Sequence, residues 1–331
     1  MSRPPLQDAF GRVARDLRVS VTDRCNFRCL YCMPEEGLRW LPRDEVLSFE
    51  EILRVVRLLV GCGIDTVRIT GGEPLVRNGV EDLVGMIATE MPRVDLSMTT
   101  NGYRLAQKAP ALAANGLRRV NVSLDSLRPA RFHAITRREG METVLDGIAA
   151  AAAAGLKPVK VNAVMVRGVN DDEAVDFARL ARENDYHVRF IEFMPLDAGH
   201  GWSRQQVVPA AELLAGIEAV FPLRPVQARG PEPAATYEFA DGAAGSVGVI
   251  ASVTEPFCGS CDRLRLTADG HLRTCLFALD AHDLKTPLRA GASDAELDEI
   301  IRGAVTAKWA GHRINASDFA APGRSMSQIG G

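Results

Sequence analysis

Short apolar and β-branched runs alternate with helical patterns between Leu17 and Phe193. Such runs, bounded by turn residues, predict β-strands. We place strands at Leu17–Thr22, Ile64–Thr70, Val94–Thr100, Arg118–Leu124, Pro158–Val164 and His187–Phe193. Strands that alternate with helices predict a parallel sheet with right-handed crossovers. Because a full barrel of this kind closes with eight strands, six strands predict an α/β fold with an open, partial (β/α)6 TIM-type barrel.

The clearest helix signal begins at Ser48. The sequence Ser-Phe-Glu-Glu places Glu51 three residues further on, which is the pattern of a capping box. Apolar residues then recur at helical spacing and predict one buried face: Ile52, Val55, Val56 and Leu59. Further helices fit Gly79–Met91, Leu105–Asn115, Glu142–Ala154 and Asp171–Asn184.

The pattern changes after Pro195. A loop at Ala198–Trp202 and a helix at Pro209–Val220 precede a connector rich in Gly and Pro, Gln227–Ala235. The later elements are short strands at Thr236–Phe239, Ser246–Ala251, Arg263–Thr267 and His271–Thr274, with Asp269-Gly270 as a hairpin turn, and a last helix at Ala295–Ala307. We therefore divide the chain near residue 200 into a barrel, 1–200, and a carboxyl-terminal segment, 201–331, that covers the open side of the barrel.

Distinctive polar residues follow the predicted strands. In barrels of this type, function gathers at the carboxyl ends of the strands. The residues at these ends are Cys25–Cys32, Gly71–Pro74, Thr99–Gly102, Ser123, Asp125, Asn162, Glu192 and Met194. We therefore expect them to share one barrel mouth.

Composition excludes several classes of protein. The formal net charge of −3 argues against a nucleic-acid binder or a polybasic membrane protein, so an anionic ligand needs a local cluster of cations. Met1–Phe10 has no apolar signal core, and the longest apolar block, Ile148–Ala154, is too short to span a bilayer. We expect a soluble, cytoplasmic protein that binds neither nucleic acid nor membrane.

The cysteines fall into two groups of three. Seven cysteines are few for this length and odd in number, which argues against a disulfide framework. The first trio is Cys25, Cys29 and Cys32, and the second trio is Cys258, Cys261 and Cys275. The seventh, Cys62, is expected to be a buried small side chain at a helix end.

The first trio has the spacing C-x3-C-x2-C on a loop directly after a strand. A structural zinc site needs four ligands, and no His, Asp or Glu lies within this loop. A redox pair of Cys29 and Cys32 would leave Cys25 without a role. A [4Fe–4S] cluster held by three thiolates, with one iron open, uses all three. Phe27 and Tyr31, between the ligands, would shield such a cluster from solvent.

The motif Gly71-Gly72-Glu73-Pro74 follows the second strand. Alone it fits a turn, in which two glycines allow a close approach of the backbone. Together with C-x3-C-x2-C it resembles the radical S-adenosylmethionine (SAM) superfamily. The resemblance implies a [4Fe–4S] cluster whose open iron chelates SAM, and an electron from that cluster that cleaves SAM to a 5′-deoxyadenosyl radical.

The resemblance extends over nearly the whole chain to one family, the GTP 3′,8-cyclases of molybdenum cofactor biosynthesis. It is carried by Arg18–Cys32, Val67–Pro74, Thr99–Gly102, Asn121–Ser126, Lys160–Asn162, Arg189–Met194, Cys258–Phe277 and Ser325–Gly331, with differences only in loops such as Pro231–Ala235. It implies a lyase that converts GTP to (8S)-3′,8-cyclo-7,8-dihydroguanosine 5′-triphosphate. In that reaction the radical removes H3′ of the ribose, and the C3′ radical attacks C8 of guanine.

The second trio has the spacing C-x2-C-x13-C and allows two interpretations. His271 lies four residues before Cys275 and would complete a zinc site, and the trio taken alone slightly favours zinc. The family resemblance instead implies a second [4Fe–4S] cluster on Cys258, Cys261 and Cys275, whose open iron takes the guanine base of GTP. A substrate ligand would explain why three protein ligands suffice.

Six cations lie inside predicted strands rather than on helix surfaces: Arg18, Arg68, Lys160, Arg189, Arg263 and Arg265. Ion pairing with Glu73, Asp125 and Glu192 is the simplest explanation. However, three acids leave a surplus of cations, and burying an unpaired charge costs several kcal/mol. A triphosphate would balance the surplus through charge-assisted hydrogen bonds of roughly 1.5–3 kcal/mol each.

The family resemblance assigns roles to individual residues. It implies GTP contacts for Arg18, Arg68, Thr99, Lys160, Arg189, Arg263 and Arg265, and SAM contacts for Tyr31, Gly72, Ser123 and Met194. It implies catalytic roles for the first trio, for Arg263 and Arg265, and for Gly330 and Gly331 of a tail that enters the active site. It also implies a low-potential electron donor of flavodoxin or ferredoxin type and a downstream cyclic pyranopterin monophosphate synthase, and it is compatible with a homodimer.

Two other functions fit parts of the pattern. A different radical SAM enzyme with an auxiliary cluster, such as a peptide-modifying enzyme, would share the cysteines, but the basic lumen and the Gly-Gly end argue against it. An iron–sulfur electron carrier or a zinc-stabilised binding module would need neither cations inside a barrel nor Gly71–Pro74 beside the first trio.

Overall fold

A computed structural model describes residues 3–196, 201–226 and 230–330. Six parallel strands form the centre of the sheet, as predicted: β1 (Asp16–Ser20), β2 (Thr66–Thr70), β3 (Asp95–Thr100), β4 (Arg119–Ser123), β5 (Lys160–Met165) and β6 (His187–Glu192). Each of these strands pairs in parallel with the next one along the chain. The α/β class is therefore confirmed.

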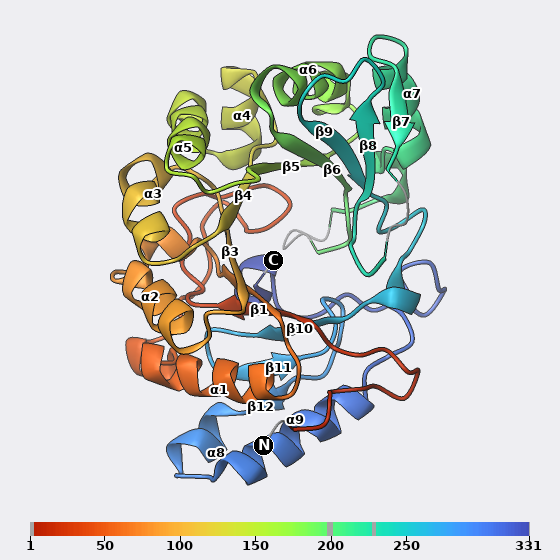
Figure 1. Cartoon of the computed structure of the whole chain (residues 1–331). Coiled ribbons are helices and arrows are strands. Elements are labelled where there is room, and N and C mark those ends of the chain that lie inside the picture. Colours follow the sequence, from red (N-terminus) through yellow and green to blue (C-terminus); the bar gives the residue numbers. More distant parts are fainter. Residues whose placement is uncertain (1–2, 197–200, 227–229, 331) are drawn as a thin grey trace.

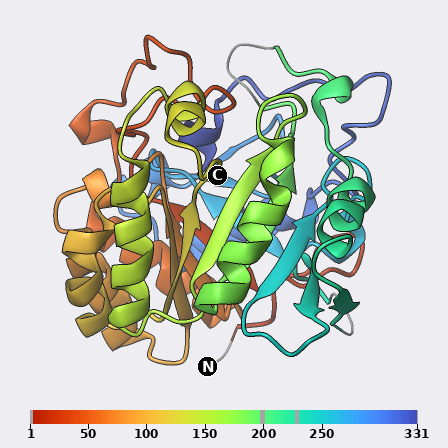
Figure 2. The same cartoon turned by 90° about the horizontal axis from the view of Figure 1, so that it is seen from above.

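Helices connect the central strands and cover the outer face of the sheet (Figures 1 and 2). Those that the sequence predicted are α1 (Phe49–Gly61), α2 (Val80–Glu90), α3 (Leu105–Ala114), α5 (Met141–Ala153) and α6 (Ala174–Asn184). The capping box of α1 is formed, because the Ser48 hydroxyl accepts from the Glu51 N–H and the Glu51 carboxylate accepts from the Ser48 N–H. Helix α4 (Pro129–Thr136) escaped prediction because eight residues are too few to show a clear helical period.

The sheet continues beyond the central strands at both edges, and it does not close within the described part of the chain. β10 (Arg263–Leu266) pairs in parallel with β1, and β9 (Ser246–Ile250) pairs in parallel with β6. Antiparallel strands extend these edges: β11 (His271–Arg273) and β12 (His282–Asp283) beyond β10, and β8 (Ala235–Phe239) and β7 (Leu223–Pro225) beyond β9. The carboxyl-terminal segment thus contributes strands to the same sheet.

The remaining helices are α7 (Ala210–Glu218), α8 (Lys285–Arg289), α9 (Asp294–Thr306) and α10 (Met326–Ile329). Single 3₁₀ turns are η1 (Arg43–Glu45), η2 (Pro74–Val76), η3 (Asp171–Glu173), η4 (Arg204–Gln206) and η5 (Cys258–Ser260). The predicted loop Ala198–Trp202 and connector Gln227–Ala235 lie partly outside the described residues, as does the division near residue 200, which stays a prediction. No helix in the described ranges has the length and apolar character needed to cross a membrane.

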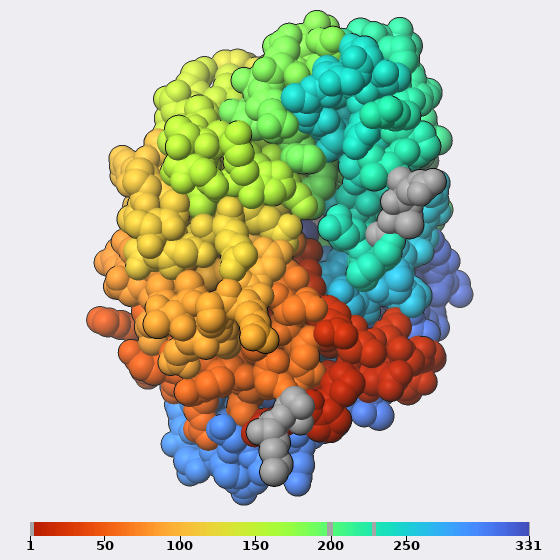
Figure 3. All heavy atoms as spheres, viewed as in Figure 1, coloured from red at the N-terminus to blue at the C-terminus, as the bar shows by residue number. Residues whose placement is uncertain are grey.

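Alternation along the strands sorts their side chains onto two faces. In β1, Leu17 and Val19 are fully buried in the main hydrophobic core, whereas Arg18 lies on the opposite face. Figure 1 shows the strands curving around a central space, which the carboxyl-terminal segment enters. On the face shown in Figure 3, side chains fill most of this central space and leave a hollow near the middle of the molecule. Polar residues of the strands therefore meet inside the curve of the sheet.

Candidate active site

The loop that carries the first trio begins against the Gly-Gly-Glu-Pro motif. The Gly72 N–H donates to the Thr22 carbonyl at 2.7 Å, and the Glu73 N–H donates to the Arg24 carbonyl at 2.8 Å. A Cβ on Gly72 would lie 2.5 Å from the carbonyl oxygens of both Asp23 and Arg24, so only glycine fits this approach. The structure therefore gives the motif a packing role beside its predicted contact with SAM.

Glu73 joins the loops that follow β2 and β3. Its buried carboxylate accepts from the Thr100 hydroxyl at 2.7 Å and from the Asn101 N–H at 2.6 Å. Burial raises the pKa of Glu73 to about 7, against the effect of these hydrogen bonds. The Asn101 amide in turn donates to the Asn26 side chain at 2.8 Å and lies 3.9 Å from the Cys25 sulfur. One network therefore positions three loops around the first trio.

The thiols of the first trio are the only groups on this loop suited to a soft metal. Burial raises the pKa of Cys25 to about 11, with a further contribution from Glu73, and it raises the pKa of Cys32 to about 12. Burial and Asp125 raise the pKa of Cys29 well above its usual value. Raised pKa values keep these half-buried thiols protonated, so their ionisation needs cations at the sulfurs, which the irons of a cluster would supply. The donor set fits a [4Fe–4S] cluster.

Aromatic side chains lie on and around this loop. Phe27 is buried and makes edge-on contacts with the rings of Tyr103 and Phe132, at centroid distances of 5.8 and 5.7 Å. The Tyr31 hydroxyl donates to the Asp125 carboxylate at 2.6 Å. Burial raises the pKa of Asp125 to about 6, although that hydrogen bond acts in the opposite direction.

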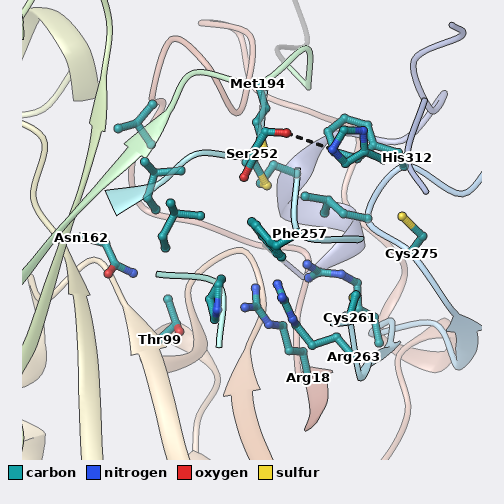
Figure 4. Close-up of a pocket in the computed structure, with 18 of the residues that line it drawn as sticks. Arg18, Thr99, Asn162, Met194, Ser252, Phe257, Cys261, Arg263, Cys275 and His312 are labelled. Carbon is teal, nitrogen blue, oxygen red and sulfur yellow. Dashed lines mark hydrogen bonds between the residues drawn. The ribbon is translucent and has the colours of Figure 1, made fainter. Parts of the chain in front are cut away.

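A cavity of about 240 Å³ lies inside the curve of the sheet. Figure 4 shows Arg18 and Arg263 at one end of it and Met194, Ser252 and His312 at the other. The predicted residues that line it are Arg18, Tyr31, Arg68, Thr99, Ser123, Arg189, Met194, Cys258, Cys261, Arg263, Arg265 and Cys275. The predicted residues that do not line it are the first trio, Gly72, Lys160 and Gly330, and Gly331 lies outside the described residues.

The register of the sheet sets three arginines side by side. Arg18 of β1 is opposite Arg68 of β2 on one side and Arg265 of β10 on the other. Burial and these two neighbours hold the pKa of Arg18 well below its usual value. Burial and Arg263 lower the pKa of Arg265 to about 10. Arg18 is half-buried and lines the cavity, so its charge faces the space that a ligand would fill.

The acids that we considered as ion-pair partners are used elsewhere. Glu73 and Asp125 accept the hydrogen bonds described above, and Glu192 accepts from the Val253 and Thr254 N–H groups at 2.7 and 2.8 Å. Within the described part of the chain, no salt bridge joins any of the three to the six strand cations. The explanation by ion pairing is therefore wrong for these acids.

A different acid, Asp16, lies among the arginines. Burial acts to raise its pKa, but Arg68, Arg18, Arg263 and Arg265 outweigh that effect and hold it below the usual value. One carboxylate faces these four guanidinium groups, with Asp95 acting on Arg68 as well, so a positive surplus remains. Asp16 was missed, although its position two residues before Arg18 places it on the same face of β1.

Arg189 and Lys160 form a second part of the cationic lining. Arg189 donates from Nε to Asn162 Oδ1 at 2.9 Å and from Nη2 to Asn121 Oδ1 at 2.7 Å. Burial and Arg68 lower the pKa of Arg189 to about 9, and burial and Arg189 lower the pKa of Lys160 to about 8. The two asparagines carry no charge, and Glu232 is the acid that acts on both Arg189 and Lys160, so two cations share one carboxylate here.

The second trio meets the same cavity from the carboxyl-terminal segment. Lys308 donates from Nζ to the Cys261 carbonyl at 2.8 Å and lies 3.9 Å from the Cys261 sulfur. Burial acts to raise the pKa of Cys261, but Arg263 and Lys308 outweigh it and hold the pKa below its usual value. Arg12 donates to the Cys258 carbonyl at 2.7 Å. Burial nevertheless keeps the pKa of Cys258 above its usual value, so the cations favour the thiolate form at Cys261 alone. Three thiols with cations beside them form a donor set that also fits an anionic metal centre.

The zinc alternative gains no support from the geometry. His271 does not line the cavity, and its Nδ1 lies 3.2 Å from the Asp269 carboxylate. Across residues 3–196, 201–226 and 230–330, no three His, Cys, Asp or Glu side chains are close enough to hold one metal ion. Neither trio is therefore arranged as a single-zinc site. A cluster places its three thiolate bonds on different irons and does not require that arrangement.

The tail reaches the arginines from the carboxyl-terminal end. Arg324 donates from both terminal nitrogens to the Asp269 carboxylate, at 3.0 and 2.8 Å. Helix α10 follows, Met326 lines the cavity, and the Gly330 carbonyl accepts a hydrogen bond from Arg265. Gly330 has φ +81°, in the left-handed region that favours glycine, and a Cβ there would lie 3.1 Å from the Cβ of Ser20.

Some residues of the site carried no signal in the sequence. Lys308 follows a helix like many surface lysines, and His312 belongs to no motif. His312 nevertheless lines the cavity and lies 2.9 Å, through Nε2, from the Ser252 carbonyl oxygen. Cys62 is buried as predicted, and its thiol also donates to Asp298 at 3.2 Å.

We expect Glu192→Ala to destabilise the protein by about 3 kcal/mol, because it leaves the buried N–H groups of Val253 and Thr254 without acceptors. Urea unfolding of the anaerobic protein measures this effect. Glu212→Ala is the matched control, since that glutamate pairs with Arg167 at the surface. Equal unfolding midpoints for the two variants would contradict the prediction.

Two family models match the chain, the Radical SAM superfamily over residues 19–181 and Molybdenum Cofactor Synthesis C over residues 186–314. The GTP 3′,8-cyclase of Streptomyces coelicolor is 52% identical over 329 residues, which cover 98% of this chain and 96% of that protein. The GTP 3′,8-cyclase of Mycolicibacterium smegmatis is 51% identical over 332 residues, which cover 99% of this chain and 92% of that protein.

Solved structures show the same fold at low identity. The crystal structure of Streptococcus suis SuiB bound to S-adenosylmethionine is similar with a TM-score of 0.60 and 13% identity. The match covers 88% of this chain and 68% of that one. A second SuiB structure gives a TM-score of 0.58. At this identity the likeness concerns the fold alone.

Proposed function

Because the chain belongs to the GTP 3′,8-cyclase family of the radical SAM superfamily, an enzyme family that acts at the first step of molybdenum cofactor biosynthesis, we propose that it converts GTP to (8S)-3′,8-cyclo-7,8-dihydroguanosine 5′-triphosphate. In the proposed reaction the 5′-deoxyadenosyl radical takes H3′ as a hydrogen atom, and the C3′ radical bonds to C8 of guanine. A further electron from the external donor and a proton then complete the 7,8-dihydro product. Both reacting atoms belong to one molecule, so the protein contributes chiefly by positioning them.

The observation that carries this proposal is the cation cluster inside the cavity. Arg18, Arg68 and Arg265 are adjacent across three strands, and Asp16 is the acid among them. A triphosphate supplies the negative charge that this lining lacks. We assign GTP contacts to Arg18, Arg68, Thr99, Lys160, Arg189, Arg263 and Arg265. Lys160 would act beside Arg189, because it does not itself line the cavity.

The first trio would hold one [4Fe–4S] cluster, with SAM on its open iron. When bound there, the cluster supplies the electron that cleaves SAM to the radical that removes H3′. We assign SAM contacts to Tyr31, Gly72, Ser123 and Met194, of which Tyr31, Ser123 and Met194 line the cavity. Tyr31 would be held in place by its hydrogen bond to Asp125. The enclosed cavity would keep water and stray hydrogen donors away from carbon radicals.

The second trio would hold a further [4Fe–4S] cluster that binds the guanine base. This proposal treats β1–β6 as a partial (β/α)6 barrel and the carboxyl-terminal segment as the carrier of the second cluster. Its support is the place of Cys258, Cys261 and Cys275 on the same cavity as the arginines. Phe257 also lines this cavity, with Arg263 4.9 Å from its ring centroid, and would enclose the base from one side.

The reaction would connect the chain to two partners. A low-potential donor of flavodoxin or ferredoxin type would supply electrons, and a cyclic pyranopterin monophosphate synthase would consume the product. We place the reaction in the cytoplasm, where GTP is available, and we propose a homodimer as an assembly to be tested by sedimentation.

An anaerobic assay with dithionite, SAM and GTP deuterated at C3′ tests the first step. We expect deuterium to appear in the 5′-deoxyadenosine by mass spectrometry. GTP deuterated at C2′ is the matched control and should transfer none. Unlabelled 5′-deoxyadenosine from the C3′-labelled substrate would rule out hydrogen abstraction at that position. Metal analysis should give about eight irons per chain for two cubane clusters.

A further inference from the structure

A second pocket, of about 460 Å³, lies on the outer side of the first-trio loop. Asn26 and Phe27 of that loop line it, together with Tyr103 after β3 and the end of α4 around His133 and Arg138. It is separate from the cavity that holds the arginines and shares no lining residue with it. None of the roles proposed above uses this pocket.

The pocket approaches a sulfur of the first trio closely. The Phe27 N–H donates to the Cys25 sulfur at 3.4 Å, so one hydrogen bond separates a residue of the pocket wall from a proposed cluster ligand. The Asn101 amide provides a second link, because it contacts both Asn26 in the wall and the Cys25 sulfur. Electron tunnelling falls steeply with distance, so this is a favourable place for an electron to enter.

The rim of the pocket is basic in a chain whose net charge is −3. His133 and Arg138 are exposed on it, and Arg104 is exposed on the loop directly after Tyr103. The acids of this region are Glu139 in the rim and Glu35, whose carboxylate lies 3.8 Å from Arg137. The lining therefore holds two arginines and one imidazole beside a single carboxylate, Glu139, and Arg104 adds a further positive charge next to it.

The shape of the pocket and the charge of its rim indicate the same kind of partner. Tyr103 is 40% exposed in the wall and packs against the buried ring of Phe27. A concave wall with aromatic rings and a basic rim matches a protruding apolar group that is surrounded by acids. A flavodoxin presents this combination, because the edge of its flavin emerges among acidic side chains. An exposed aromatic ring inside a charged rim is also typical of protein interfaces.

We propose that this pocket is the docking site of a flavodoxin-type electron carrier, a small acidic flavoprotein, which reduces the cluster on the first trio. The inference rests on the proposed function. The reduced flavin gives up one electron, the cluster gains it, and no bond is made or broken. The pocket shares no lining residue with the cavity proposed for SAM and GTP, so a carrier docked there would not compete with the substrates. Charge attraction to the basic rim steers the encounter.

Charge reversal at the rim tests the proposal. Arg104→Glu, His133→Glu and Arg138→Gln are combined in one variant of the cluster-loaded enzyme, where the glutamine removes the charge but keeps a donor for the Asn26 carbonyl that Arg138 contacts. Formation of 5′-deoxyadenosine is measured with reduced flavodoxin and, separately, with dithionite. We expect the KM for flavodoxin to rise about tenfold or more at low salt, with a weaker dependence on ionic strength. The dithionite-driven rate should stay within about twofold of the wild type, because a small reductant does not need the rim.

Arg93→Glu is the matched control, since Arg93 is exposed just before β3, at the opposite end of that strand from Tyr103. It should leave both rates unchanged. Binding of oxidised flavodoxin, followed by NMR line broadening, gives a readout that does not depend on turnover and should weaken only in the triple variant. An unchanged KM and unchanged binding in the triple variant would overturn the docking site, as would reduction by a ferredoxin and not by flavodoxin. Failure of the wild type with dithionite would instead count against the proposed function.

Discussion

Replacement of Arg18 by methionine is expected to remove GTP-dependent activity and, at the same time, to make the free protein more stable. Arg18 lies between Arg68 and Arg265 in the sheet register, and its Nε has no hydrogen-bond partner in the described structure. Like charges at this spacing repel, and methionine removes one of them while keeping an unbranched chain. We expect the free energy of unfolding without GTP to rise by an amount on the order of 1 kcal/mol.

The same substitution removes a ligand contact. Two charge-assisted hydrogen bonds of roughly 1.5–3 kcal/mol each correspond to a loss of about 10²- to 10⁴-fold in GTP affinity or turnover. Anaerobic calorimetry with and without GTP measures both effects, because the stabilisation by GTP that wild type shows should vanish in Arg18→Met. Arg15→Met is the matched control, since Arg15 is exposed and pairs with Asp65 outside the cavity. A less stable Arg18→Met protein without GTP would contradict the repulsion argument.

The arginine cluster shows which parts of the site the sequence could predict and which it could not. The strand pattern placed Arg18, Arg68 and Arg189 inside predicted strands, because that pattern is local and needs no knowledge of the neighbouring strand. The pairing of β1 with both β2 and β10 is not local. It decides that Arg265, more than 240 residues further along the chain, becomes the direct neighbour of Arg18.

The acids illustrate the same limit. Glu73, Asp125 and Glu192 have the charge needed to pair with arginine, but backbone N–H groups and hydroxyls satisfy them instead. These donors come from loops whose conformation the sequence pattern does not specify. Lys308 is a stronger example, because nothing around it in the sequence indicates a contact with Cys261. The cysteines of the first trio could be singled out from the sequence because their spacing within one loop is itself the signal.

The tail connects the two halves of the proposed site. The Arg265 guanidinium donates to the Gly330 carbonyl, and the Ser327 N–H acts to lower the pKa of Cys32 in the first trio. Asp269 fixes the start of the tail through Arg324. The tail therefore lies between a ligand of the first trio and the arginine that neighbours the second trio, where Arg265 also interacts with Cys275.

Deletion of Gly330 and Gly331 is expected to abolish cyclised product while both clusters remain, since no proposed cluster ligand lies in the tail. The measurements are product by anaerobic chromatography and iron content with the absorbance of the clusters. Truncation leaves a new carboxylate at Ile329, and this negative charge is able to pair with the Arg265 guanidinium in place of the Gly330 carbonyl. Gly330→Ala avoids that charge and keeps the chain length, but its Cβ meets Ser20 and its φ disfavours alanine, so we expect a loss of about tenfold or more in turnover.

Two further variants separate positioning of the tail from general stability. Asp269→Asn weakens the hold on Arg324 and should lower the rate less than the deletion, because Gly330 can still reach Arg265. Arg313→Ala breaks a surface pair with Asp318 outside the cavity and should change nothing. If the deletion variant turned over GTP at the wild-type rate, the contact between Arg265 and Gly330 would be a resting contact without a part in the reaction. If the deletion removed product and both clusters together, the tail would instead stabilise the fold. The expected order of rates, with wild type above Asp269→Asn and Asp269→Asn above the deletion, would then not be observed.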